Sequence, residues 1–193
     1  GKSLHIAHNI CNILRNGYCV VCNFDINRDV VKVSKRSNFN YVPNDELTPG
    51  RLIGYSEYYF KNHKFKEGRI NLIIDEAQII FNAREWNVSG RAAWLSFFTQ
   101  HRKYGYDIYL IAQFDRMLDR QIRSLIEYEY KHRKIKNFGF GGWVLNLVGG
   151  GGLFIAVKIW YPLQEKIGQE LFRYSRKYEK LYDSYKSFSS ETV

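Results

Sequence analysis

The sequence predicts an α/β fold in which a mostly parallel central sheet is the middle of three layers, with extra strands at the C-terminus. Residues 70–74 and 106–113 are apolar runs typical of strands that are buried on both faces. Residues 2–15, 49–62 and 91–104 carry apolar side chains at helical spacing, and each of these segments precedes a strand. Helices that alternate with buried strands indicate parallel strands joined by crossover helices.

The first elements are a helix and a short strand. Within residues 2–15, apolar side chains recur at the i, i+3, i+4, i+7 spacing of one helix face, and Gly17 is placed to end the helix. The apolar run at residues 19–24 follows as a strand. Residues 25–46 are polar and predict a loop, in which an edge strand with a basic face at residues 31–36 is an alternative.

The next two helices are identified by a start signal and by an aromatic face. Thr48 offers an N-cap and Pro49 the first helical position, so the helix over residues 49–62 has a defined beginning. Residues 86–90 form a loop before the helix over residues 91–104, which carries most of its aromatic side chains on one face. The strand at residues 106–113 comes next.

The C-terminal part predicts additional strands. Residues 115–126 have a helical pattern, and residues 127–136 alternate between apolar and charged side chains, as a half-exposed strand would. The glycine-rich segment 139–152 then joins this strand to another at residues 153–161. Residues 165–185 predict a surface helix or an extended tail.

One stretch raises the question of a membrane span. Residues 142–163 are largely apolar, but they contain Asn146, Lys158 and five glycines. A connection between the two strands of a hairpin is therefore favoured over a spanning helix.

Two carboxylates follow the first of the buried runs. Asp75 and Glu76 come directly after residues 70–74, at the carboxyl end of the strand, where open α/β sheets bind ligands. This is the arrangement of a Walker B motif, in which Asp75 would hold the Mg²⁺ of a nucleotide and Glu76 would polarise the attacking water. The alternative is a solvated acidic turn, in which Glu76 is an N-cap or an ion-pair partner.

The first three residues resemble the end of a Walker A motif, GxxxxGK[ST]. Lys2 would reach the β- and γ-phosphates of ATP, the Ser3 hydroxyl would ligate Mg²⁺, and Gly1 would close the phosphate-binding loop before the helix. The five preceding motif positions would lie before Gly1, so a chain that begins here is expected to bind ATP poorly. Together with the acidic strand end, these residues predict a P-loop NTPase that uses ATP and Mg²⁺.

Two further residues complete the candidate site. Gln113 ends the second buried strand and would lie beside Asp75 if the two strands are neighbours. Its amide would then contact the γ-phosphate or the attacking water. The alternative is that the amide caps a loop. Arg123, followed by Arg120, is the candidate for the arginine that one subunit of a P-loop motor places against the γ-phosphate of the next. Its alternative role is an ion pair with Glu127.

Size, charge and cysteines set the class of protein. The 193 residues are expected to form one domain, residues 1–193, and the balance of 29 basic and 19 acidic residues gives a net charge of +10. Such a charge suits an anionic partner, either nucleic acid or a membrane surface, although a merely solvated surface is the alternative.

The three cysteines are interpreted as buried thiols of a reducing cytoplasm, because no second pair completes a zinc site.

The order of five sequence blocks makes the chain similar to a known family. These blocks are GKS, NLIIDEAQ, QHRKYG, DIYLIAQ and DRQIR, and they resemble the zonula occludens toxin family, the morphogenesis ATPases of filamentous phages. The similarity extends from Gly1 to about Arg123 and is most specific at residues 101–113. Residues 181–185 resemble the end of that family's cytoplasmic domain less specifically.

The resemblance implies a location and a role. It implies a P-loop ATPase domain at the cytoplasmic face of the bacterial host's inner membrane, part of a longer protein with one membrane-spanning segment that follows this domain. It also implies ATP-dependent assembly and extrusion of phage, with phage coat and assembly proteins as partners. A homo-oligomer is expected, as for other P-loop motors.

Three functional hypotheses remain at this point. The chain is an ATP-hydrolysing motor, a structural assembly module that keeps the fold without turning over nucleotide, or a nucleic-acid translocase of the DNA-pump type that acts on single-stranded DNA. The net charge of +10 favours the third hypothesis.

Overall fold

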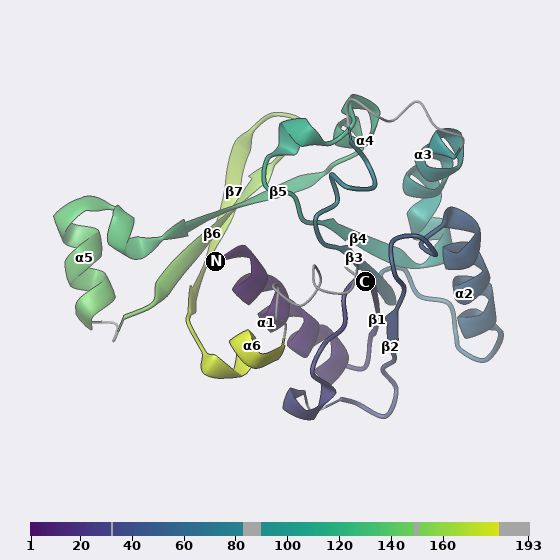
Figure 1. The fold of residues 1–193 in the computed structure, drawn as a ribbon, viewed down its shortest axis with the longest axis horizontal. Helices are drawn as coiled ribbons and strands as arrows, with labels where there is room; N and C mark the ends of the chain where they lie inside the picture. Colours follow the sequence, from purple (N-terminus) through teal and green to yellow (C-terminus); the bar gives the residue numbers. More distant parts are fainter. Residues whose placement is uncertain (32, 83–89, 149–150, 182–193) are drawn as a thin grey trace, which may run out of the picture. The chain divides into compact units, whose positions relative to one another are not determined.

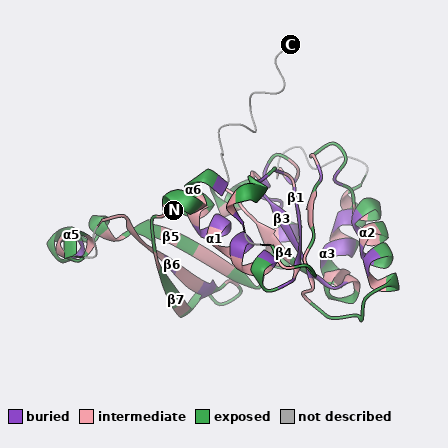
Figure 2. Cartoon of the chain, turned by 90° about the horizontal axis from the view of Figure 1, so that it is seen from below, coloured by how far each residue is buried: buried purple, intermediate pink, exposed green. Residues whose placement is uncertain are grey.

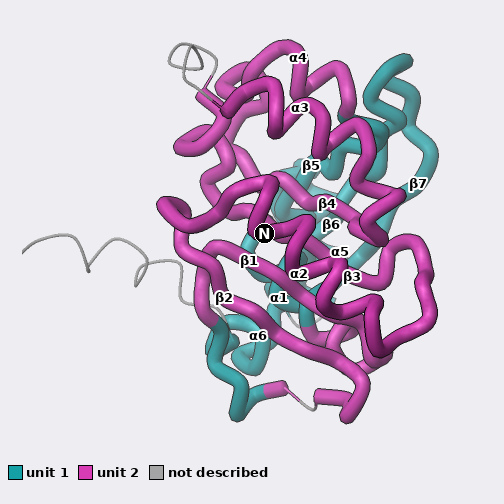
Figure 3. The backbone as a smooth tube through the Cα atoms, turned by 90° about the vertical axis from the view of Figure 1, so that its right-hand side faces the viewer, with its two compact units in different colours: residues 1–10, 26–30, 126–193 teal, residues 11–25, 31–125 magenta. Residues whose placement is uncertain are grey.

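The computed structural model describes residues 1–31, 33–82, 90–148 and 151–181 (Figure 1). The chain divides into two compact units (Figure 3). Unit 1 contains residues 1–10 and 26–30 and the chain from residue 126 onward, and unit 2 contains residues 11–25 and 31–125. The expectation that the whole chain forms one domain stays a prediction.

Unit 2 is built on a four-stranded parallel sheet in the order β2-β1-β3-β4. The four strands are β1 (Cys19–Cys22), β2 (Phe39–Tyr41), β3 (Ile70–Ile74) and β4 (Tyr106–Leu110). Every residue of β1 and β3 is buried, as expected for strands that are covered on both faces. The predicted α/β class with a parallel central sheet is therefore confirmed.

The register brings the carboxyl ends of the strands to one edge of the sheet. Val20 of β1 lies opposite Phe39 of β2 and Asn71 of β3, and Ile74 at the end of β3 lies opposite Leu110 at the end of β4. Segments that leave β1, β3 and β4 consequently start side by side at this edge.

Helices cover the sheet of unit 2 on both faces (Figure 2). On one face lie α2 (Pro49–Lys61) and α3 (Arg91–Gln100), and on the other lie residues 11–15, the last turn of α1 (Lys2–Arg15). Tyr106 of β4 joins the layers, because its buried hydroxyl donates a hydrogen bond of 2.8 Å to the carbonyl oxygen of Leu52 in α2. This is the predicted three-layer arrangement.

The predicted start of α2 is confirmed in detail. Thr48 is the N-cap, and its hydroxyl accepts a hydrogen bond of 3.3 Å from the backbone N–H of Arg51. Pro49 occupies the first helical position, where its missing N–H leaves no intrahelical bond unmade.

Several predicted boundaries in unit 2 differ from the structure. The edge strand is β2 rather than residues 31–36, of which Lys32 lies outside the described residues. The strand predicted over 19–24 ends at Cys22, and the one over 106–113 ends at Leu110. The aromatic helix changes into a 3₁₀ turn at His101, and most of the loop predicted at residues 86–90 is not described.

Unit 1 contains the extra C-terminal strands as an antiparallel sheet in the order β5-β6-β7. The segment after β4 first forms the short helix α4 (Arg120–Ser124), which still belongs to unit 2. The elements of unit 1 that follow are β5 (Tyr128–Lys134), α5 (Gly139–Val148), β6 (Leu153–Trp160), β7 (Glu165–Arg173) and α6 (Arg176–Leu181).

The predicted hairpin is confirmed, because the glycine-rich segment 139–152 joins the antiparallel strands β5 and β6. Helix α5 within this connection was not predicted, and residues 149–150 after it are not described. The prediction of a surface helix or a tail for residues 165–185 was wrong in the first half of this segment, where β7 pairs with β6 across one register shift. In the second half, α6 is a helix whose residues are mostly exposed, and residues 182–185 lie outside the described chain. Within the described ranges, no helix combines the length and apolar character needed to cross a membrane.

Gly105 ends the 3₁₀ turn before β4, and its backbone is left-handed (φ +71°). An added Cβ would lie 2.7 Å from two ring carbons of Phe60. We expect Gly105→Ala to lower the free energy of unfolding by about 1–3 kcal/mol, because backbone strain and the clash add up.

Gly54 is the matched control. It lies inside α2 with nothing within 4 Å of an added Cβ, so Gly54→Ala should raise the free energy of unfolding by about 0.5–1 kcal/mol. Urea titrations of both variants should give shifts of opposite sign. A Gly105→Ala variant as stable as the wild type would show that position 105 does not require glycine.

Candidate functional site

The candidate site of unit 2 lies at the carboxyl edge of the parallel sheet. Two backbone hydrogen bonds extend the pairing of β3 and β4 beyond the strand ends: Ile111 N–H donates to the Ile74 carbonyl at 2.9 Å, and Ala77 N–H donates to the Ile111 carbonyl at 2.9 Å. They hold the segment of Asp75 and Glu76 beside the segment that leads to Gln113. The structure therefore brings these three predicted residues to one edge.

Asn23 fixes the backbone at Asp75. It follows β1 directly, and its side chain accepts the Asp75 N–H at 2.8 Å and donates to the Asp75 carbonyl at 2.9 Å. The same amide group donates to Asn44 at 2.8 Å. Asn23 was not predicted as a site residue, because the strand expected over residues 19–24 included it, whereas β1 ends at Cys22.

Glu76 has a left-handed backbone conformation (φ 48°), which is uncommon for a residue other than glycine. Two hydrogen bonds hold it there: its N–H donates to the Asp75 carboxylate at 2.9 Å, and its carbonyl accepts the Ile79 N–H at 2.8 Å. Such strain costs on the order of 1–3 kcal/mol and is concentrated at functional sites. The half-buried Glu76 side chain consequently leaves the strand in a fixed direction.

Gln78 orients the Glu76 carboxylate. Its side-chain Nε2 donates a hydrogen bond to Glu76 Oε2. The Oε1 atom of Gln78 is buried and has no hydrogen-bond partner within the described part of the chain. A buried acceptor of this kind is normally satisfied by water or a ligand, so it marks a place where either can bind. Gln78 was part of the block NLIIDEAQ, but no role was predicted for it.

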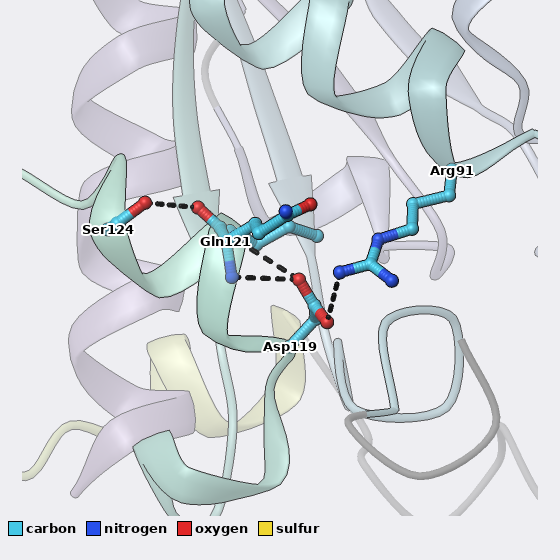
Figure 4. A network of polar contacts seen from close by, with 5 residues as sticks. Arg91, Asp119, Gln121 and Ser124 are labelled. Carbon is cyan, nitrogen blue, oxygen red and sulfur yellow. Dashed lines mark hydrogen bonds and ion pairs between the residues drawn. The ribbon is translucent and has the colours of Figure 1, made fainter. Parts of the chain in front are cut away.

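Asp119 organises the segment that carries Arg123 (Figure 4). One carboxylate oxygen of the buried Asp119 accepts the backbone N–H groups of Gln121 at 2.8 Å and Ile122 at 3.4 Å, and so caps α4. The other oxygen accepts a hydrogen bond of 3.1 Å from Arg91 at the start of α3. The position of α4 is therefore tied to α3 by a charged pair.

Arg123 lies on α4 and is half-buried. Its backbone N–H donates to the Asp119 carbonyl at 3.0 Å, whereas its side-chain Nε is buried and carries no hydrogen bond among the described residues. Arg123 thus has donor capacity left, which is what a role toward a phosphate requires.

Gly1, Lys2 and Ser3 belong to unit 1, where α1 begins at Lys2. The Gly1 carbonyl accepts the N–H of His5 at 3.0 Å, which closes the first helical turn. Since Ser3 and Asp75 belong to different units, the magnesium site that they are predicted to share stays a prediction.

A cationic cavity of about 670 Å³ lies at the start of α1 within unit 1. Lys2 lines it together with residues of β5, β6 and the turn after β5: His132, Arg133, Lys134, Asn137, Phe138 and Phe154. Three basic side chains around one cavity favour an anionic ligand such as a phosphate.

A pair of histidines lies beside this cavity. The rings of His5 and His132 are joined by a hydrogen bond of 2.8 Å between Nδ1 and Nε2, and the other nitrogen of His5 lies 3.3 Å from Glu170. Burial, followed by the neighbouring His5, lowers the pKa of His132 to about 4. Burial also lowers the pKa of His5, although Glu170 opposes this shift. No local sequence pattern predicts the pair, because its members are more than a hundred positions apart.

The histidine pair predicts an acid-side loss of stability. The unfolded chain protonates its histidines near pH 6.5, whereas folded His132 does so only near 4. In between, the unfolded state binds more protons, so the free energy of unfolding should fall as the pH drops from about 6.5 to about 4. His132→Gln should reduce this loss, as measured by urea titrations at neutral pH and at about pH 5.

Lys177→Gln, at an exposed position of α6 in the same unit, is the matched control and should lose as much stability as the wild type. If His132→Gln showed the wild-type difference between the two pH values, the histidine pair would not be its cause.

The donor chemistry of the site fits Mg²⁺. Among the residues that the structure describes, no three His, Cys, Asp or Glu side chains gather as in a metal site made by protein alone. Mg²⁺ is usually bound through one or two carboxylates together with phosphate oxygens and water. Asp75, with the hydroxyl of Ser3 as the second predicted ligand, offers oxygen donors of this kind.

A family model described as "Zonular occludens toxin (Zot)" matches residues 1–187. No match to the chain was found among curated proteins.

Solved structures with similar folds include two viral packaging proteins. The DNA-packaging ATPase B204 from Sulfolobus turreted icosahedral virus is 17% identical, with 91% of this chain and 93% of that chain covered and a TM-score of 0.53. The genome-packaging NTPase B204 of Sulfolobus turreted icosahedral virus 2, in complex with sulfate, is 17% identical over 90% of each chain, with a TM-score of 0.50. At these identities the similarity shows the fold.

The N-terminal domain of zonular occludens toxin from Neisseria meningitidis also matches. It is 16% identical, with 86% of this chain and 80% of that chain covered and a TM-score of 0.49.

Proposed function

Because the chain belongs to the zonular occludens toxin (Zot) family, we propose that it is the ATP-hydrolysing motor domain of a filamentous phage assembly and extrusion protein. The protein would act as a homo-oligomer at the cytoplasmic face of the host's inner membrane, together with phage coat and assembly proteins. The observation that carries the proposed activity is the acidic end of the buried strand β3, with Glu76 in a strained and hydrogen-bonded position.

Glu76 is the catalytic carboxylate in this proposal. It polarises the water that attacks the γ-phosphate and accepts a proton from it. Gln78 donates to one carboxylate oxygen and so directs the group, while its own unpaired Oε1 offers an acceptor to a water molecule. Gln113, exposed on the same sheet edge, contacts the γ-phosphate or that water.

Nucleotide binding involves the start of α1 and Asp75. Gly1 and Lys2 bind the phosphates, and Arg133 and Lys134 add positive charge to the same cavity. Ser3 and Asp75 hold Mg²⁺, and Asn23 keeps the Asp75 backbone in place through its two hydrogen bonds. The ion, when bound with ATP, neutralises charge on the phosphates.

A nucleic-acid translocase is the second candidate. The net charge of +10 favours it, since an excess of basic side chains attracts a phosphate backbone. Single-stranded DNA would then be the substrate that ATP hydrolysis moves. The third candidate is an assembly module that does not hydrolyse nucleotide. The measurement of ATP turnover in the wild type and in Glu76→Gln tests it.

Glu76→Gln and Asp75→Ala should have different effects in the intact protein. A carboxylate that polarises water acts mainly in the transition state, so Glu76→Gln should lower ATP turnover by about 10²–10⁴-fold and leave ATP affinity unchanged. Asp75→Ala should weaken Mg²⁺-dependent ATP binding itself. Steady-state turnover and nucleotide titrations with and without Mg²⁺ measure the two effects.

Glu57→Gln is the matched control, because Glu57 is exposed on α2 and belongs to no part of the proposed site. It should behave as the wild type in both measurements. Turnover of Glu76→Gln close to that of the wild type would assign Glu76 a structural role in the turn.

Arg123 is proposed to act on the nucleotide of a neighbouring subunit. Such arginines stabilise the charge of the transition state and are worth about 10³–10⁵ in rate. Arg123→Ala should therefore keep ATP binding and lose turnover in the oligomer, whereas Arg120→Ala tests the second candidate on the same helix. Unchanged turnover per subunit in Arg123→Ala would remove this residue from the mechanism.

A further inference from the structure

Helix α5 in unit 1 carries its apolar side chains on the outside. Phe140 and Val148 are 81% and 82% exposed, and Trp143, Leu145 and Leu147 are each more than half exposed. Four of these residues follow an i, i+3, i+7, i+8 spacing and form one stripe along the helix, and the rings of Phe140 and Trp143 stack at 6.2 Å. Burial of these side chains would be strongly favourable, so the stripe is suited to an apolar partner.

The opposite side of α5 anchors the helix to the end of the β5–β6 hairpin. Gly142 is buried against the preceding turn so closely that an added Cβ would lie 2.3 Å from the Ile135 carbonyl oxygen. The Asn146 side chain accepts the N–H of Leu153, the first residue of β6, at 3.0 Å. Figure 2 shows α5 at the end of the hairpin with most of its surface exposed. The apolar stripe is therefore held in a fixed orientation.

The surroundings of the stripe are basic. Residues 130–164 contain no acidic residue. Four exposed cations lie at the base of α5, on β5, in the turn after β5 and at the end of β7: Arg133, Lys134, Lys136 and Arg173. Arg173 belongs to this group because it pairs with Leu153, the first residue of β6. An apolar helix face beside several exposed cations is the combination that binds anionic lipid surfaces.

We propose that α5 docks unit 1 on an anionic lipid bilayer. The apolar stripe enters the boundary between headgroups and acyl chains, and Lys136 and Arg173, which do not line the nucleotide cavity, bind lipid phosphates. The helix has 10 residues, which at about 1.5 Å per residue give a length of about 15 Å, half of a hydrocarbon core. It therefore lies in the interface, where the rings of Phe140 and Trp143 are favourable.

The basic residues around the apolar stripe favour an anionic membrane over a second copy of the chain as the partner that covers it. A second α5 would bring the same basic surroundings, and pairing the two stripes would place like charges beside each other. An anionic bilayer covers the same stripe and neutralises these charges. This inference does not depend on whether the chain hydrolyses ATP.

Flotation with lipid vesicles tests the proposal. The protein should float with vesicles of phosphatidylglycerol and phosphatidylcholine in equal parts, and much less with phosphatidylcholine alone. Phe140→Asp should weaken binding to the anionic vesicles by at least about tenfold, because it removes apolar burial and adds repulsion. Lys136→Gln should weaken it by roughly fivefold, and added salt should do the same.

Leu163→Asp is the matched control. Leu163 is 60% exposed in the turn between β6 and β7, at the other end of β6 from α5, so this variant should bind like the wild type. Undiminished binding of Phe140→Asp, or equal binding to both vesicle types, would overturn the proposal. A change in oligomeric state of Phe140→Asp without lipid, seen by sedimentation velocity, would identify a second copy as the partner instead and overturn it as well.

Discussion

The complete burial of β3 is the constraint on which unit 2 depends. A strand covered on both faces admits apolar side chains, and its one polar residue, Asn71, is accommodated because its amide donates to the Cys19 carbonyl of β1. Charged residues have to leave the strand at its end. With β1 and β4 paired on either side in parallel, everything that leaves at that end meets at one edge. Placement of Asp75 and Glu76 is thus a consequence of core packing.

The sequence predicted those elements whose signals are local. The start of α2 depends on Thr48 and Pro49, and the burial of β3 depends on five consecutive residues, so both were found. Strand β7 and helix α5 were missed because both depend on contacts that exist only in the folded chain. The first is defined by pairing with β6, and the second by the close approach that Gly142 permits.

The candidate site likewise contains residues that local sequence signals predict and residues whose role depends on contacts in the folded chain. Asp75, Glu76 and Gln113 could be placed at one edge from strand ends alone. Asn23 and Gln78 act through side-chain hydrogen bonds whose geometry exists only after folding, so neither had a predicted role. Ser3 and Asp75 were expected to meet, and that pairing stays a prediction.

The left-handed backbone of Glu76 has a consequence for how mutations at this position are tolerated. Glycine adopts such a conformation without strain, so the fold by itself would be served better by glycine than by a glutamate. With the catalytic role proposed for Glu76, a carboxylate at this position is a trade-off between activity and stability. Variants selected only for heat resistance would then tend to lose the acid at position 76 and keep the rest of the turn.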